Sequence, residues 1–224
     1  MEFSARLRQL ADPVWQAQHD HPFVRGIGDG SLPLEQFQFW IRQDYLFLVE
    51  YCRLFGLAAA RAPDLATLAR FADLLHATAR TEMDLHRAYA AELGILAEDL
   101  EREEMAPATR AYTDFLVRVA ATGDFVELVA ALLPCMWGFS EIGQHLAAGG
   151  RSADHRYAAW IKMYASSDFA ELAAWCRRLL DRVAADAGEE ARRRMEDAFL
   201  TSSRYELAFW DAARTQQRWP DRRG

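Results

Sequence analysis

Apolar residues recur at intervals of three and four along almost the whole chain, and this period constrains the fold more than any other feature. No convincing run alternates apolar and polar residues, as a half-buried strand would require. Glycine or proline, often beside a capping residue, separates the periodic segments. The sequence therefore predicts an all-α protein. Its 224 residues, 51% of them hydrophobic, can bury one substantial core, and we expect residues 1–224 to form a single domain.

The periodic segments predict seven or eight helices. Asp64 is a suitable N-cap for the third helix, and Asp124 and Asp168 each begin a capping box. Segment 21–33 is expected to be a loop, because its glycines permit backbone angles that other residues avoid. The helices are expected at about 3–19, 33–60, 64–94, 108–121 and 124–149, then from Ser152 or Asp154, from Asp168, and at 189–219.

The charge balance excludes several classes of protein. A net charge of −7 argues against a surface that neutralises nucleic-acid phosphates. No stretch of 18 uncharged apolar residues occurs, and the first residues lack the apolar core of a signal peptide. We therefore expect a cytoplasmic protein that binds neither nucleic acid nor a membrane. The three cysteines, Cys52, Cys135 and Cys176, lie in separate contexts, which fits reduced thiols better than disulfides.

Two carboxylates interrupt apolar stripes. Asp44 fills the one gap in the series Phe37, Ile41, Leu48, Tyr51, Phe55. Glu206 fills the gap in the series Met195, Phe199, Ser202, Phe209, Ala213. Both should point inward, and a buried ionised carboxylate costs several kcal/mol unless partners satisfy it. They are either structural, as buried ion pairs, or part of a functional site.

Cys135 lies in the middle of a third apolar stripe, directly after Pro134. A proline inside a helix removes one backbone hydrogen bond, here at the carbonyl of Ala130, and bends the axis. A cysteine on an apolar stripe is usually a packing residue, and Cys52 and Cys176 fit that description. The bend, together with Asp44 and Glu206, makes Cys135 a candidate nucleophile.

One histidine pair and two tyrosines have ambiguous roles. Glu82 and His86 lie four residues apart on one helix face, which could suit a metal. Di-iron bundles, however, use Glu and His three apart on at least two helices, so a hydrogen bond in the core is the alternative. We expect no metal. Tyr112 and Tyr164 could line a site, but aromatics at helical spacing are more often core residues.

A series of motifs resembles the TenA-like thiaminase II proteins of the TenA/THI-4 family. The motifs are His21 to Gly30, Leu32-Pro33, Gln43-Asp44, Glu82 to His86, Leu132 to Trp137, Glu141 to Gly143, Tyr164 to Ser166 and Ser202 to Trp210. They follow the family's order and approximate spacing along the whole chain. The resemblance implies a haem-oxygenase-like multi-helix bundle without haem, usually assembled as a homotetramer.

The same resemblance implies roles for five residues. Asp44 would bind the ring nitrogen and the exocyclic amine of an aminopyrimidine. Cys135 would attack the ring, and Glu206 would carry protons. Tyr112 and Tyr164 would position that glutamate and the substrate. The family has a cysteine and a glutamate subgroup, and Cys135 is typical of the cysteine subgroup.

Two departures from the family pattern concern the substrate-binding positions. Phe47 and Phe139 stand where better known members have tyrosines. Each loss removes a hydroxyl, and therefore a hydrogen bond to the substrate or to the thiol. The preferred leaving group is consequently open.

The residues and the resemblance together predict a hydrolase of thiamine metabolism. It would convert 4-amino-5-aminomethyl-2-methylpyrimidine, and thiamine, to 4-amino-5-hydroxymethyl-2-methylpyrimidine by cysteine addition to the ring, without a cofactor. Three alternatives stay open: a pyrimidine-binding accessory protein without turnover, a metal-dependent oxidase on the same bundle, and a transcriptional regulator. The oxidase would need more converging ligands, and the regulator a surface that the acidic charge does not supply.

Overall fold

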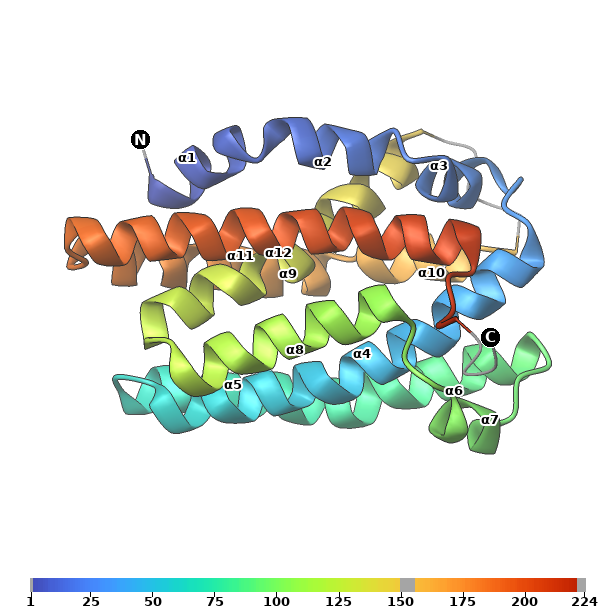
Figure 1. Cartoon of the computed structure of the whole chain (residues 1–224), viewed down its shortest axis with the longest axis horizontal. Helices are drawn as coiled ribbons and strands as arrows, with labels where there is room; N and C mark the ends of the chain where they lie inside the picture. Colours follow the sequence, from blue (N-terminus) through green and yellow to red (C-terminus); the bar gives the residue numbers. More distant parts are fainter. Residues whose placement is uncertain (1, 150–155, 221–224) are drawn as a thin grey trace. The chain divides into compact units, whose positions relative to one another are not determined.

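The computed structural model describes residues 2–149 and 156–220, and within those ranges it contains helices and no strand (Figure 1). The all-α prediction is confirmed. Two compact units can be recognised: unit 1 comprises Met1–Pro33 and Val126–Asp211, and unit 2 comprises Leu34–Phe125 and Ala212–Gly224. The single domain expected from the length stays a prediction.

Unit 2 is organised around one long helix, α4 (Leu34–Arg61), along which α5 and α8 pack (Figure 1). Asp64 caps α5 as predicted, because its carboxylate accepts the backbone N–H of Thr67 at 2.7 Å. The other elements are α5 (Leu65–Ala77), η1 (Thr78–Glu82), α6 (Met83–Glu92), α7 (Ala97–Arg102) and α8 (Pro107–Thr122).

The predicted helix 64–94 is not one continuous α-helix. Its middle, η1, is a single π-helical turn that separates α5 from α6. Gly94, with a φ of 77°, follows the end of α6. Helix α7 has no counterpart among the predicted helices, because six residues are too few to show a helical period. The π-turn places an extra residue between the two helices, and Glu82 is the last residue of this turn.

Unit 1 contains seven helices in the described part of the chain, two of which extend by a few residues into unit 2. They are α1 (Phe3–Leu10), α2 (Asp12–His19), α3 (Pro22–Asp29), α9 (Phe125–Ala148), α10 (Ala158–Tyr164), α11 (Ser167–Ala185) and α12 (Glu189–Thr215). Helix α1 is tied to α11 by Ser4, whose backbone N–H and hydroxyl donate to the Asp181 carboxylate at 2.7 and 2.8 Å.

The prediction for the first 33 residues was partly wrong. A break at Ala11 divides the expected first helix, and Pro13 stands in the first turn of α2. Segment 21–33, expected to be a loop, forms α3, and the side chain of His21 accepts the backbone N–H of Phe23 at its start. Its internal glycines serve close packing. A Cβ on Gly26 would lie 3.1 Å from the Leu32 backbone.

Two helix ends also differ from the prediction. Helix α11 is capped by Ser166, whose hydroxyl accepts the N–H of Phe169, and not by Asp168. Helix α12 ends at Thr215 and not near residue 219, and Gln216 follows with a φ of 50°. The helix start predicted at Ser152 or Asp154 lies outside the described residues.

Helix α9 is the most apolar element. By length and composition it could cross a membrane, but 72% of its most apolar stretch of 18 residues is buried inside the protein. That burial is typical of a core helix. Pro134 lies inside α9 and is buried, and the helix continues beyond it. The proline is therefore accommodated within one helix.

We predict that Gly143→Ala destabilises the protein, because α9 and the end of α10 meet at this glycine. An added Cβ would lie 2.5 Å from the carbonyl carbon of Tyr164 and 2.8 Å from the nitrogen of Ala165, so backbone must move. Overpacking of this kind costs about 1–3 kcal/mol. Urea denaturation followed by circular dichroism measures the loss.

Gly138→Ala on the same helix is the matched control. Its Cβ would meet no heavy atom closer than 4.0 Å, and alanine favours a helix over glycine by about 1 kcal/mol. We expect this variant to be neutral or more stable. Equal stability of the two variants would contradict the close contact at Gly143.

Candidate functional site

Asp44 is buried on α4, with 3% of its surface exposed, as the helical period predicts. Its partner is His86 of α6, itself 4% exposed, whose Nε2 lies 2.6 Å from Asp44 Oδ2. The other ring nitrogen of His86, Nδ1, lies 3.1 Å from the backbone carbonyl oxygen of Glu82. The two residues therefore join α4 to α6 by a buried contact between their side chains.

Glu82 and Cys52 surround this pair with further titratable groups. Burial, and then the nearby Asp44 carboxylate, raises the pKa of Glu82, although the charge of His86 and a hydrogen bond from Thr78 oppose the rise. Burial and the charge of Glu82 raise the pKa of the Cys52 thiol to about 11. Cys52 is thus a poorly ionised thiol, in keeping with the packing role expected for it.

Phe47 and Tyr112 are in contact within unit 2. Their ring centroids are 5.1 Å apart, and Phe47 also stacks on Tyr51 at 5.4 Å. All three rings are buried. Phe47 leaves α4 one turn after Asp44, so an aromatic wall is part of the same helix as the buried carboxylate.

Unit 1 contains the other predicted residues. Cys135 is half-buried on α9, and Glu206 is buried on α12, with 2% of its surface exposed. The inward direction predicted for Glu206 is confirmed. Cys176, by contrast, is completely buried on α11, as expected of a packing residue. The catalytic roles of Cys135 and Glu206 stay a prediction.

Phe139 and Tyr164 are also in contact within unit 1. Their ring centroids are 4.9 Å apart, and Phe139 also lies 5.2 Å from the ring of Trp210. Tyr164 meets Phe169 edge to face at 5.0 Å. The close approach of Gly143 to the Tyr164 backbone fixes this tyrosine against α9.

Glu141 of α9 belongs to a separate ion-pair cluster. Arg8 of α1 approaches its two carboxylate oxygens at 2.8 and 3.4 Å, and His19 Nε2 lies 3.1 Å away. Burial alone would raise the pKa of Glu141, but the hydrogen bonds and charges of His19 and Arg8 outweigh it and lower that pKa to about 2. This motif residue therefore holds helices together.

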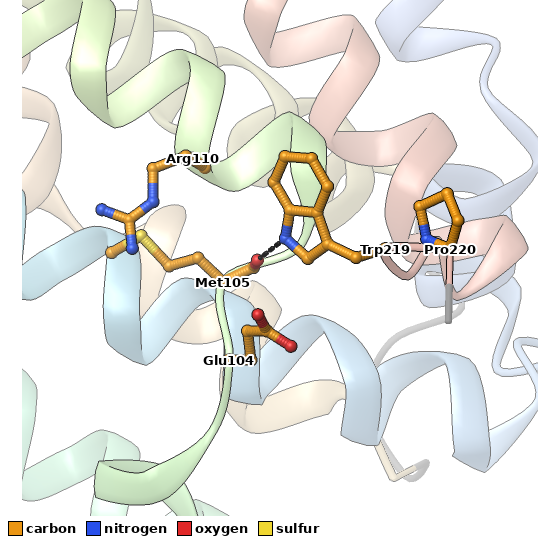
Figure 2. A pocket seen from close by; sticks show the side chains of 5 residues that line it. All are labelled: Glu104, Met105, Arg110, Trp219 and Pro220. Atoms are coloured by element: carbon orange, nitrogen blue, oxygen red, sulfur yellow. Dashed lines mark hydrogen bonds between the residues drawn. The ribbon is translucent and has the colours of Figure 1, made fainter. Parts of the chain in front are cut away.

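A surface pocket of about 360 Å³ lies in unit 2 (Figure 2). It is lined by Glu104, Met105, Arg110, Trp219 and Pro220. The indole N–H of Trp219 donates to the carbonyl oxygen of Met105 at 2.8 Å and so closes one side (Figure 2). None of the site residues predicted from the sequence lines this pocket.

The spacing of Glu82 and His86 leaves their role open at the level of the sequence. In the structure His86 makes hydrogen bonds to the backbone carbonyl of Glu82 and to the side chain of Asp44. Helical periodicity could not reveal this partner, because it places a residue on a face without saying which helix that face meets. Over residues 2–149 and 156–220, no group of three or more His, Cys, Asp or Glu side chains could hold a metal ion.

The comparisons with known proteins agree with the motifs. The model of the TENA/THI-4/PQQC family matches residues 8–216. This chain belongs to that family. Among curated family relatives, the "Aminopyrimidine aminohydrolase" of Halalkalibacterium halodurans is 48% identical over 220 residues, which cover 98% of each chain.

Solved structures of the family have the same fold. A TenA homologue from P. horikoshii OT3 superposes with a TM-score of 0.89 at 29% identity, covering 96% of this chain and 99% of that one. A domain of unknown function from Shewanella denitrificans, described as having a heme oxygenase-like fold, gives a TM-score of 0.75 at 16% identity. It covers 95% of this chain and 92% of its own. The haem-oxygenase-like helical bundle expected for this family member is confirmed.

We predict that Glu141 makes the stability of the protein acid-sensitive. Its folded pKa of about 2 lies below the ordinary value of 4.5, so its stabilisation is present above pH 4.5 and is lost as the pH falls toward 2. Glu141→Gln should cost about 1 kcal/mol of unfolding free energy at pH 7, the upper range for partly exposed pairs. Denaturant titrations should show a smaller difference in unfolding free energy between Glu141→Gln and the parent at pH 3 than at pH 7.

Glu196→Gln is the control for this titration. Glu196 pairs with Arg6 at 3.0 Å on the surface, where ion pairs contribute little. It should leave the unfolding free energy nearly unchanged at both pH values. A constant deficit of Glu141→Gln from pH 7 to pH 3 would contradict the assignment.

Proposed function

We propose that this chain is an aminopyrimidine aminohydrolase of thiamine pyrimidine salvage. It hydrolyses 4-amino-5-aminomethyl-2-methylpyrimidine, and also thiamine, to 4-amino-5-hydroxymethyl-2-methylpyrimidine. The observation that carries this proposal is the 48% identity, over 98% of both chains, to a protein named aminopyrimidine aminohydrolase. At that coverage the match extends over nearly the whole length of both proteins.

Asp44 is proposed to bind the substrate. A carboxylate accepts hydrogen bonds, and the exocyclic amine of an aminopyrimidine donates them. His86 satisfies one carboxylate oxygen of Asp44 at 2.6 Å, which offsets the cost of its burial. The rings of Phe47 and Tyr112, 5.1 Å apart on the same unit, offer faces on which a flat heteroaromatic ring can stack.

Cys135 is proposed as the nucleophile. Its thiolate adds to a ring carbon, which makes the substituent on the ring methylene a better leaving group. The amine of the aminomethyl group, protonated at neutral pH, departs as ammonia and water adds at the methylene. Elimination of the thiolate then restores the ring, and the proton on the ring nitrogen passes to the released ammonia. Cys52 is unsuited to this role, since its pKa of about 11 leaves little thiolate at neutral pH.

Glu206 is proposed as the proton carrier of the same reaction. It protonates the ring nitrogen as the thiolate adds and takes a proton from the attacking water, so that it ends in its starting form. Its burial on α12 supports such a role, because a solvated carboxyl would exchange its proton with bulk water. Tyr164, packed against Phe139, is proposed to position substrate and glutamate together with Tyr112.

A binding protein without turnover is the second candidate. The observation in its favour is that Phe47 and Phe139 lack the hydroxyls expected at these positions, and both rings are buried among other aromatics.

We also propose that the chain forms a single domain and lies in the cytoplasm, as expected from the sequence, and that it assembles as the homotetramer that the resemblance implies.

We predict that Cys135→Ser abolishes turnover while Cys52→Ser retains it. A hydroxyl is a far weaker nucleophile than a thiolate, whereas Cys52 is a poorly ionised thiol outside the proposed chemistry. Chromatography of the hydroxymethylpyrimidine released from the aminomethyl substrate measures both rates.

Glu206→Gln should lose at least about a hundredfold in kcat in the same assay.

Circular dichroism of the three variants controls for folding. Full activity of Cys135→Ser would rule out the covalent route. If the parent protein binds the aminomethyl substrate but releases no product, the binding-protein candidate replaces the hydrolase.

We also predict that Phe47→Tyr combined with Phe139→Tyr raises turnover several-fold. Each hydroxyl can restore one hydrogen bond worth about 0.5–1.5 kcal/mol, which is up to about tenfold in rate. The control is Phe55→Tyr. Phe55 is a buried ring of α4 that meets Tyr51 edge to face, and it is not one of the two positions at which this chain departs from the family pattern. It should give no gain. A double variant no faster than the parent would show that the missing hydroxyls do not limit the reaction.

A further inference from the structure

The ring of His86 is held between two hydrogen-bond acceptors that come from different elements. Nδ1 lies 3.1 Å from the carbonyl oxygen of Glu82 on η1, and Nε2 lies 2.6 Å from Oδ2 of Asp44 on α4. We propose that His86 is doubly protonated and positions Asp44 as a carboxylate, so that Asp44 selects ligands whose ring edge donates hydrogen bonds. This inference rests on the proposed binding of an aminopyrimidine by Asp44.

The proton on Nδ1 follows from the chemistry of its partner. A backbone carbonyl oxygen can only accept a hydrogen bond, so the contact with Glu82 requires a proton on Nδ1. In a neutral imidazole the other nitrogen would then present a lone pair. That lone pair would face Asp44 Oδ2.

The contact at Nε2 therefore contains one more proton. Two bare acceptors do not approach to 2.6 Å inside a protein, so the proton lies either on Nε2 or on the carboxyl oxygen. In water an imidazole is more basic than an aspartate carboxylate by about 2.5 pKa units. Burial opposes the ion pair, because it penalises both charges.

The surroundings of the ring favour the proton on His86. Burial lowers the pKa of His86, but the hydrogen bond and charge of Asp44, the charge of Glu82 and the Glu82 carbonyl together raise it above its ordinary value. Cys52 faces Glu82 from α4 as a neutral thiol, and Thr78 of η1 donates to Glu82. The other ring contact of His86 is the indole of Trp40, which carries no charge. A cationic imidazole is thus surrounded by acceptors and negative charge.

The charge state decides which ligands Asp44 can bind. Among the described residues, His86 is the hydrogen-bond partner of this carboxylate, through Oδ2, which leaves Oδ1 to accept from a ligand. An aminopyrimidine offers its exocyclic amine and, when the ring is protonated, a ring N–H beside it. A 4-oxopyrimidine presents a carbonyl oxygen in place of the amine, so it loses the donor at that position and keeps only the ring N–H beside it. Sites built in this way reject the mismatched analogue strongly.

The charge of His86 can be read directly by nitrogen NMR of the ¹⁵N-histidine-labelled protein. Both ring nitrogens of His86 should show the imidazolium signature at pH 7 and keep it at about pH 8, where a free imidazole, with a pKa of about 6.5, is neutral. His76, which is exposed on α5, provides a second histidine signal for comparison. In Asp44→Asn, a nearly isosteric variant, the introduced side-chain amide can donate to Nε2, and His86 should become a neutral Nδ1–H imidazole. A neutral His86 in the parent, or an unchanged spectrum in Asp44→Asn, would overturn the proposal.

Ligand binding tests the consequence for selectivity. Calorimetry with 4-amino-5-hydroxymethyl-2-methylpyrimidine and its 4-oxo analogue should show at least about a hundredfold preference of the parent for the amino compound. His86→Gln, which can still donate one N–H to Asp44 but carries no charge, should lose most of that preference and bind the amino compound at least about tenfold more weakly. His76→Gln should behave as the parent. Equal selectivity of His86→Gln and the parent would overturn the positioning role. If the parent binds no aminopyrimidine, the proposed function fails, while the NMR result still decides the charge of His86.

Discussion

The buried contact between Asp44 and His86 is the interaction on which the organisation of unit 2 depends. It joins the long helix α4 to α6 at 2.6 Å, in surroundings that exclude water. Removing either partner would leave an uncompensated buried polar group, which usually costs several kcal/mol. The same contact fixes the orientation of the carboxylate proposed to bind substrate. The structure of unit 2 and the proposed selectivity therefore depend on one pair of side chains.

Much of this arrangement could be predicted from the sequence, because burial follows the helical period. Asp44 and Glu206 interrupt apolar stripes, and both are buried. The partner of Asp44 could not be predicted in the same way, since the period of one helix does not say which neighbour it faces. The α3 helix was missed for a different reason. Gly26 allows close packing on Leu32 and Gly28 on Leu146, whereas glycine in a sequence usually signals a turn.

Unit 1 shows how one helix can carry the proposed nucleophile and structural groups at different positions along its length. Helix α9 bears Cys135 and Phe139 on its apolar stripe, and Glu141 pairs with Arg8 of α1. Gly143, one turn after Phe139, lets the backbone at Tyr164 approach closely. These contacts of α9 lie within about two turns of the proposed nucleophile.

The π-turn η1 couples the length of the chain to the chemistry of the site. A π-turn contains one residue more than an α-helical turn. Deleting one residue from Thr78–Glu82 would therefore leave an ordinary α-helical turn with His86 still facing Asp44, whereas one added residue would turn α6 by about 100° relative to α5. The register of this segment therefore decides which face of α6 meets Asp44.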